Sequence, residues 1–167
     1  MGNTVSEDKV DRLKAVVGYA PGVFDMFHIG HLNVLQRAKE HCDYLIVGVV
    51  TDERVEAIKS ARPMMPLNER MELVASLDLV DDVVVDDSFD KVEMWDKLHF
   101  DVIFKGDDWR GTPKGDQLER GMADRGARVV YFPYTQHISS TRLRALINAA
   151  NDAARTGSSV DLEDSGD

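Results

Sequence analysis

The chain has 167 residues, of which 43% are hydrophobic and 30% are charged, a balance typical of one globular domain. Its formal net charge of −10 argues against a general affinity for nucleic acids or anionic membranes. No apolar run approaches the roughly 18 residues of a membrane-spanning helix, and the N-terminus lacks the apolar core of a secretory signal. Cys42 is the single cysteine, which excludes an internal disulfide framework and a cysteine-rich zinc site. We therefore expect a cytoplasmic protein with no nucleic-acid or membrane partner.

Apolar runs alternate with helical patterns along the chain. The first half predicts, in order, a strand at Ala15–Ala20, a helix at His31–His41, a strand at Tyr44–Val50, and helices at Asp52–Lys59 and Asn68–Leu77. The second half predicts a strand at Val83–Val85, a helix at Phe89–Leu98, a strand at Val102–Lys105, a helix at Gln117–Arg125, a strand at Val129–Phe132 and a helix at Ser140–Ala150. This order predicts an α/β, Rossmann-like three-layer fold with a mostly parallel central sheet. Ligands of such folds bind beyond the carboxyl ends of the strands.

The composition divides the chain into a body and two ends. We expect a flexible N-terminus at residues 1–12, a folded domain at 13–151 and an acidic, disordered tail at 152–167, where Ser, Gly and Asp predominate. Two local details belong to the body. Asn68 is the predicted N-cap of its helix, and the last helix places Leu143, Leu146 and Ile147 on one face.

Two histidines follow the first predicted strand directly. His28 and His31 are three residues apart, with Gly30 between them. If a helix begins here, both imidazoles lie on nearly one face near its N-terminus, where free N–H groups and the helix dipole favour a phosphate. Gly22, just before them, permits a ligand to approach the backbone closely. The alternatives are that one histidine caps or packs while the other is solvated, or that the pair binds a metal, although no third ligand is evident.

Polar residues also follow the strands at Val102–Lys105 and Val129–Phe132. Gly106 ends the first of these strands, and Asp107 and Asp108 can accept hydrogen bonds from a base amino group or a ribose hydroxyl, while Trp109 offers a stacking face. The alternative is an ordinary Asx turn with a hydrophobic plug. Residues 139–141 precede the last helix, where one hydroxyl can cap and the others suit phosphate oxygens.

These segments together resemble a known family. The run GVFDMFHIGH at residues 22–31 is similar to the HxGH motif of the cytidylyltransferase-like branch of the nucleotidyltransferase superfamily. The run FKGDDW at residues 104–109 is similar to a segment of bacterial glycerol-3-phosphate cytidylyltransferases, and ISST at 138–141 to the family's closing segment. The resemblance runs from about Val16 to about Ile147. It implies a nucleotidyltransferase, in which a phosphate oxygen of the acceptor attacks the α-phosphorus of a nucleoside triphosphate and pyrophosphate leaves.

The resemblance also implies roles for individual residues. Catalytic roles fall to His28, His31 and Lys59. Nucleotide contacts fall to Gly22, Val23, Phe24, Gly30, Gly106, Asp107, Asp108, Trp109, Ile138, Ser139, Ser140 and Thr141. Acceptor contacts fall to Asp25, Lys59 and Lys91. The resemblance further implies Mg²⁺ carried by the nucleotide, no dedicated metal site, and a homodimer.

The sequence departs from the family at a few positions. Tyr134 and His137 stand where glycerol-3-phosphate cytidylyltransferases usually carry arginine and glycine, and Val23 stands where threonine is common. An acidic protein needs local cations to hold a triphosphate and a phosphate together. The candidates are Lys59, Arg62, Arg70, Lys105, Arg142 and Arg144.

The substrates are the least determined part of this interpretation. The stretch Ser60–Arg70 also resembles heptose-phosphate adenylyltransferases, which carry KGGDY where this chain has KGDDW. Because of the second aspartate and the tryptophan, we favour CTP and glycerol 3-phosphate, giving CDP-glycerol and pyrophosphate. The alternatives are an adenylyltransferase acting on a sugar phosphate or flavin, and a non-catalytic nucleotide-binding regulator of the same fold.

Overall fold

The computed structural model describes residues 15–135 and 138–157, so the expectations for residues 1–12, for His137 and for the tail beyond Gly157 lie outside it. The strands are β1 (Val17–Gly22), β2 (Tyr44–Val50), β3 (Asp82–Asp86), β4 (Val102–Gly106) and β5 (Arg128–Phe132). The helices are α2 (Ile29–Lys39), α3 (Asp52–Lys59), α4 (Leu67–Ala75), α5 (Lys91–Leu98), α6 (Pro113–Ala123) and α7 (Ser140–Gly157), with a 3₁₀ turn η1 (Asp107–Trp109).

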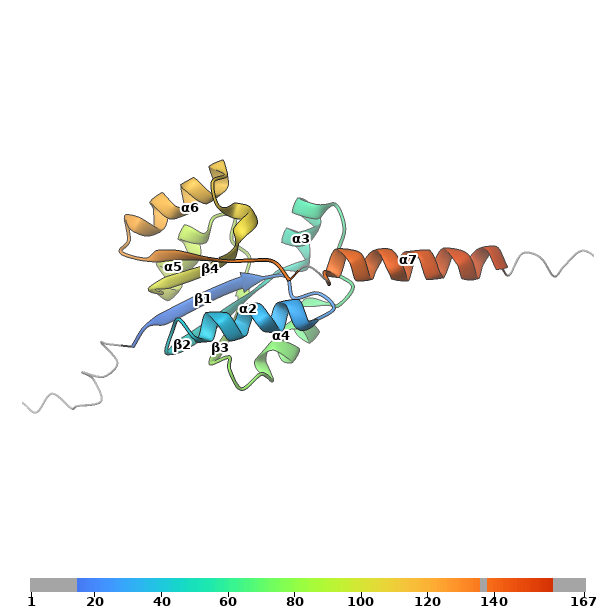
Figure 1. Ribbon diagram of the computed structural model, residues 1–167, viewed down its shortest axis with the longest axis horizontal. Coiled ribbons are helices and arrows are strands. Elements are labelled where there is room, and N and C mark those ends of the chain that lie inside the picture. Colours follow the sequence, from blue (N-terminus) through green and yellow to red (C-terminus); the bar gives the residue numbers. More distant parts are fainter. Residues whose placement is uncertain (1–14, 136–137, 158–167) are drawn as a thin grey trace, which may run out of the picture.

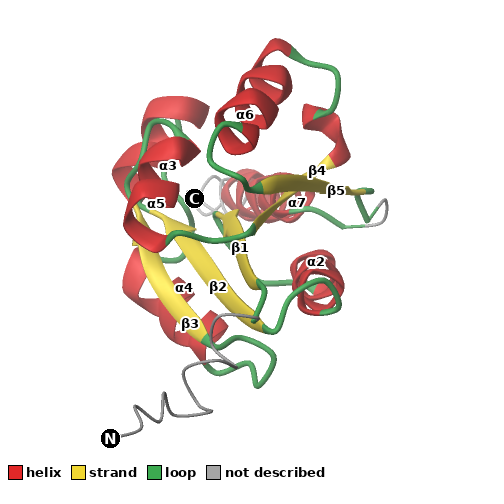
Figure 2. Ribbon diagram, turned by 90° about the vertical axis from the view of Figure 1, so that its left-hand side faces the viewer, coloured by secondary structure: helices red, strands yellow, loops and turns green. Residues whose placement is uncertain are grey.

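The strands form one parallel sheet of five in the order β3-β2-β1-β4-β5, which confirms the predicted α/β, Rossmann-like fold (Figure 1). Figure 2 shows β1 near the middle, between β2 and β4. The chain builds outward from β1 to β3 and then returns to add β4 and β5 on the other side. The crevice between the carboxyl ends of β1 and β4 is therefore the place where this fold binds ligands.

Two apolar cores sandwich the sheet. On one face, α2 and α4 bury Leu35, Ala38 and Val74 against the strands, and on the other face α5 and α6 bury Met94 and Met122. The strand β2 is apolar almost throughout because both of its faces are covered. No helix among the described residues is long and apolar enough to span a membrane.

Several boundaries differ from the sequence-based expectation. Helix α6 begins at Pro113 instead of Gln117, because Thr112 caps it and proline suits the first helical position. Asn68 is not an N-cap: α4 starts one residue earlier, after Pro66, whose ring fixes the extended entry. Helix α7 continues to Gly157, into the segment where we expected tail.

The outer part of α7 leaves the body of the protein (Figure 1). Leu146 is 62% exposed and Ile147 is 38% exposed, so the apolar face identified in the sequence does not pack onto the sheet along its whole length.

One buried cation fastens the loops at the carboxyl end of the sheet. The Arg70 side chain is fully buried and donates hydrogen bonds to the carbonyl oxygens of Val23, Val50 and Met65 and to the carboxylate of Asp52. These partners follow β1, end β2, precede α4 and open α3. The sequence suggested Arg70 as a phosphate ligand, but its hydrogen bonds are all made within the fold, so its role is structural.

Replacement of Arg70 by Met should lower the free energy of unfolding by about 3–5 kcal/mol, because it leaves a carboxylate and three carbonyls without their donor. Urea unfolding followed by circular dichroism measures this loss. The matched control is Arg62→Met, which removes an exposed arginine paired with Glu53 and Glu56 and should change stability by at most about 0.5 kcal/mol. Equal effects of the two substitutions would contradict the structural role of Arg70.

Candidate active site

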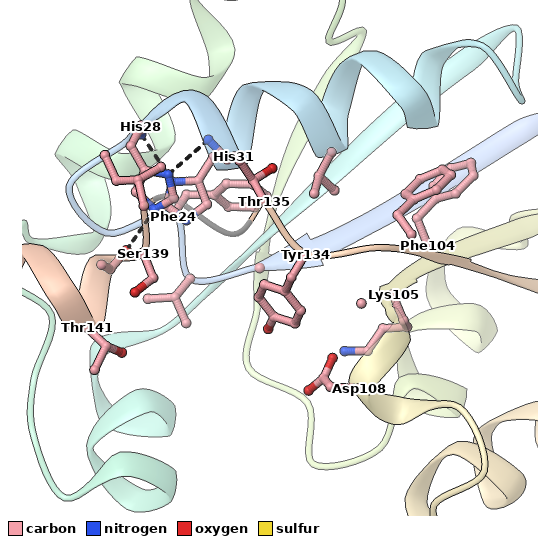
Figure 3. A pocket seen from close by; sticks show the side chains of 18 of the residues that line it. Phe24, His28, His31, Phe104, Lys105, Asp108, Tyr134, Thr135, Ser139 and Thr141 are labelled. Atoms are coloured by element: carbon pink, nitrogen blue, oxygen red, sulfur yellow. Dashed lines mark hydrogen bonds between the residues drawn. The ribbon is translucent and has the colours of Figure 1, made fainter.

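A cavity of about 320 Å³ opens at the carboxyl ends of β1 and β4, beside the start of α2 and the start of α7. Figure 3 shows its walls. Most of the residues singled out in the sequence line it, although they come from segments far apart in the chain. These are Gly22, Val23, Phe24, His28, Gly30, His31, Lys59, Gly106, Asp108, Trp109, Ile138, Ser139, Ser140 and Thr141.

His28 and His31 contact each other and form the cap at the start of α2. His28 is the N-cap, and its Nδ1 accepts the N–H of Gly30 at 3.0 Å. His31 Nδ1 in turn accepts the N–H of His28 at 3.3 Å, and the two rings stack with their centroids 3.9 Å apart. Because both Nδ1 atoms act as acceptors, each neutral ring carries its proton on Nε2. The pair therefore presents two N–H donors beside a helix N-terminus.

Gly30 is required by this arrangement. A Cβ at position 30 would lie 2.8 Å from Cε1 of His28, closer than side-chain atoms pack. The spacing of the HxGH motif thus has a local steric reason, since any larger residue between the histidines would push the capping ring away.

The start of α7 closes the same side of the cavity. Ser140 Oγ lies 3.5 Å from Nε2 of His28 and donates to the carbonyl oxygen of Asp25 at 2.6 Å. Ser139 Oγ accepts the N–H of Arg142, so this hydroxyl caps the helix. The predicted capping role is therefore present, and the segment also lines the cavity where phosphate binding was predicted.

Burial shapes the charge of the histidine pair. Burial of its ring, aided by the neighbouring His28 and Lys59, lowers the pKa of His31 to about 4, against the opposing influence of Asp25. Burial also lowers the pKa of His28. Both imidazoles are thus neutral donors at pH 7, and an anion bound against them would raise their pKa values.

The opposite wall belongs to β4 and η1. Lys105 places its ammonium 3.9 Å from the centroid of the Trp109 ring, so one face of that ring is occupied. Burial, reinforced by the charge of Lys91, lowers the pKa of Lys105 to about 8. A Cβ at Gly106 would lie 2.6 Å from a carboxylate oxygen of Asp108 and 3.0 Å from the Tyr134 ring, which explains the glycine at this strand end.

Three of the residues implied by the resemblance do not line the cavity. Asp25 is buried, and its carboxylate accepts the N–H groups of Met64 and Met65 and a guanidinium hydrogen of Arg144. It holds the loop before α4 instead of facing a ligand. The other two are Lys91, which binds the buried Asp86 and Ser88 Oγ, and Asp107, which is exposed on η1.

The structure adds residues that the sequence reasoning did not assign to the site. They are Pro21, Val34, Phe104, Lys105, Phe132, Pro133, Tyr134 and Thr135. Lys105 and Tyr134 had been noted only as a candidate cation and as a departure from the family. The run 133–135 follows β5, in a loop that the sequence already placed beyond a strand end without assigning these residues.

The depressed pKa of His31 predicts how stability depends on pH. The unfolded chain protonates His31 near its ordinary pKa of about 6.5, whereas the folded chain resists protonation until a pKa of about 4. The unfolded state binds more protons between these values, so the free energy of unfolding falls as the pH drops through that window. His31→Asn should flatten this part of the curve in urea unfolding from pH 7.5 to 4.5. The exposed His99, replaced by Asn, serves as the control and should leave the slope unchanged.

Comparison with known proteins identifies relatives of this chain. A family model described as cytidylyltransferase-like matches residues 19–146. Glycerol-3-phosphate cytidylyltransferase from Bacillus spizizenii is 35% identical over 133 residues, which cover 79% of this chain and 95% of that protein. Ethanolamine-phosphate cytidylyltransferase from Arabidopsis thaliana is 37% identical over 133 residues, covering 77% of this chain but only 31% of that longer protein.

A solved structure supports the fold. The lipopolysaccharide core biosynthesis protein from Thermoplasma volcanium superposes with a TM-score of 0.62 at 23% identity, covering 74% of this chain and 99% of that one. The two cytidylyltransferases named above differ in the acceptor that their names give. From the family match over most of its length, the chain belongs to the cytidylyltransferase-like family of nucleotidyltransferases.

Proposed function

We propose that the chain transfers CMP from CTP to a small alcohol phosphate, with glycerol 3-phosphate as the favoured acceptor and CDP-glycerol and pyrophosphate as products. The observation that carries this proposal is the stacked pair His28 and His31, whose Nε2 donors share one cavity with Asp108, Trp109 and Ser140. The match along nearly the whole Bacillus spizizenii glycerol-3-phosphate cytidylyltransferase supports the choice of acceptor.

The step requires stabilisation of charge. A phosphate oxygen of the acceptor bonds to the α-phosphorus of CTP, the bond from that phosphorus to the bridging oxygen breaks, and its electron pair leaves on pyrophosphate. In this proposal His28 and His31 donate from Nε2 to phosphate oxygens. The ammonium of Lys59 balances the negative charge of these oxygens. The hydroxyls of Ser139 and Thr141 and the backbone N–H groups at the N-terminus of α7 hold the departing pyrophosphate, since the Ser140 hydroxyl already donates to the carbonyl oxygen of Asp25.

Mg²⁺ enters the proposal with the nucleotide. Within residues 15–135 and 138–157, no cluster of three or more His, Cys, Asp or Glu side chains could hold a metal ion. Triphosphate oxygens are themselves suitable ligands for Mg²⁺, and the ion screens their charge. The protein then orients the metal–nucleotide complex through the donors of His28, His31 and Lys59.

The choice of CTP rests on the wall formed by η1. The carboxylate of Asp108 can accept a hydrogen bond from the exocyclic amino group of cytosine. The Trp109 ring lines the cavity and offers an aromatic surface for a base.

We further propose that the chain acts in the cytoplasm as a homodimer. Leu146 and Ile147 are exposed on the part of α7 that leaves the body, and apolar side chains in such a place suit packing against a second copy. Light scattering should then give about twice the chain mass of 18.7 kDa. A mass equal to one chain across the micromolar range would contradict the dimer.

Turnover with a panel of nucleotides tests the reaction. Pyrophosphate release should be fastest with CTP and glycerol 3-phosphate, compared with ATP, GTP and UTP and with other alcohol, sugar and flavin phosphates. Turnover with ATP alone would replace cytidylyl transfer by adenylyl transfer. No pyrophosphate from any pair would indicate a nucleotide-binding regulator.

A substitution that keeps the fold but removes one donor tests the role of His28. Asparagine is a good N-cap whose side-chain oxygen can replace Nδ1, but it has no donor at the place of Nε2. His28→Asn should therefore lower kcat by about 10²–10³ while leaving the melting temperature within a few degrees. The control His99→Asn should keep full activity. If His28→Asn retains turnover, the histidine serves α2 and not the reaction.

A further inference from the structure

The proposed reaction brings two anions together, and the acceptor phosphate needs a cation of its own. We propose that Lys105 binds the phosphate group of the acceptor substrate, a role that rests on the proposed nucleotidyl transfer. Its ammonium lies in the cavity wall against Trp109, 3.9 Å from the centroid of the ring.

Several other cations near the site are already engaged, and Lys59, which also lines the cavity, is assigned to the triphosphate in the proposed function. Arg70 is buried among carbonyl oxygens, and Arg144 binds Asp25 and the carbonyl oxygen of Arg62. Arg62 itself pairs with two glutamates on α3, and Lys91 pairs with the buried Asp86. Lys105, by contrast, has no hydrogen bond or ion pair within the ranges that the structure describes. Its contact with a ring face leaves its N–H groups able to meet an incoming oxygen anion.

The direction from which Lys105 approaches favours the acceptor over the triphosphate. Side chains of a strand alternate between the two faces of a sheet, so Lys105 belongs to the face of Ile103, which α5 and α6 cover. His28 and His31 lie at the start of α2, on the other face. Figure 3 shows the histidines at one end of the cavity and Lys105 with Asp108 at the other.

The separation of the histidines from Lys105 suits the geometry of nucleotidyl transfer. In phosphoryl transfer the attacking and leaving oxygens lie roughly in line across the phosphorus. If the histidines and the start of α7 hold the departing pyrophosphate, the attacking phosphate must arrive from the opposite side, where Lys105 lies. Its N–H groups would donate to acceptor oxygens that do not react, and no proton needs to move.

The environment of Lys105 favours the binding of an anion. Burial and the like charge of Lys91 disfavour the ammonium and lower its pKa to about 8, while Asp86 and Asp108 favour the charged form. A bound phosphate dianion would stabilise the charge further. The Trp109 ring holds the cation by its quadrupole without neutralising it.

Steady-state kinetics of Lys105→Met tests the assignment. This variant keeps an unbranched side chain that is one atom shorter and removes the charge. We expect the KM for the acceptor phosphate to rise about 10- to 100-fold, with the KM for CTP changed by less than about twofold. Lys105→Arg should recover most of the loss. In the unmodified chain the acceptor KM should rise above about pH 8, and this rise should vanish in Lys105→Arg.

Lys97→Met is the matched control, because it removes the same charge from an exposed lysine on α5 that pairs with Asp87 at 3.3 Å. It should leave both KM values unchanged. A rise in the KM for CTP alone would assign Lys105 to the nucleotide, and unchanged KM values would remove it from binding; either result overturns the proposal. Absence of turnover in the unmodified chain with every substrate pair would instead refute the proposed function itself. If another nucleotide and acceptor phosphate are the true pair, the same comparison applies to them.

Discussion

The hydrogen bond from the N–H of Gly30 to Nδ1 of His28 fixes the geometry on which the site depends. It ends the loop after β1, starts α2 and sets the orientation of the capping ring in one contact. The N–H of His28 then orients the His31 ring by donating to its Nδ1. The same rings hold the turn through Nδ1 and carry their N–H donors at Nε2, which ties the local folding of this turn to its chemistry.

The loops around this turn are held by buried charge. Arg70 joins the residues after β1 to those after β2, and Asp25 joins the same turn to the loop before α4 and, through Arg144, to α7. Such groups are costly to bury, and each is matched by several partners. Rigid placement of the donors follows, and rigid donors stabilise developing charge without reorganising during the reaction.

The two walls of the cavity differ in electrostatic character. The two imidazoles are neutral at pH 7 and carry N–H donors, with the charge of Lys59 close enough to lower the pKa of His31. The wall of β4 instead carries the ammonium of Lys105 against the Trp109 ring. The cavity therefore has positive charge available at both ends.

The sequence by itself determined the elements and the motifs, because these depend on spacing along the chain. Apolar periodicity predicted β2 and α3 to the residue, and the pattern of His28 and His31 predicted a phosphate-binding helix start. Only the tertiary structure decided which charges face the cavity. Asp25 and Arg70 carry the same charges as site residues, yet they have partners across the fold that hold them in the interior. Those contacts depend on distances through space that no local pattern encodes.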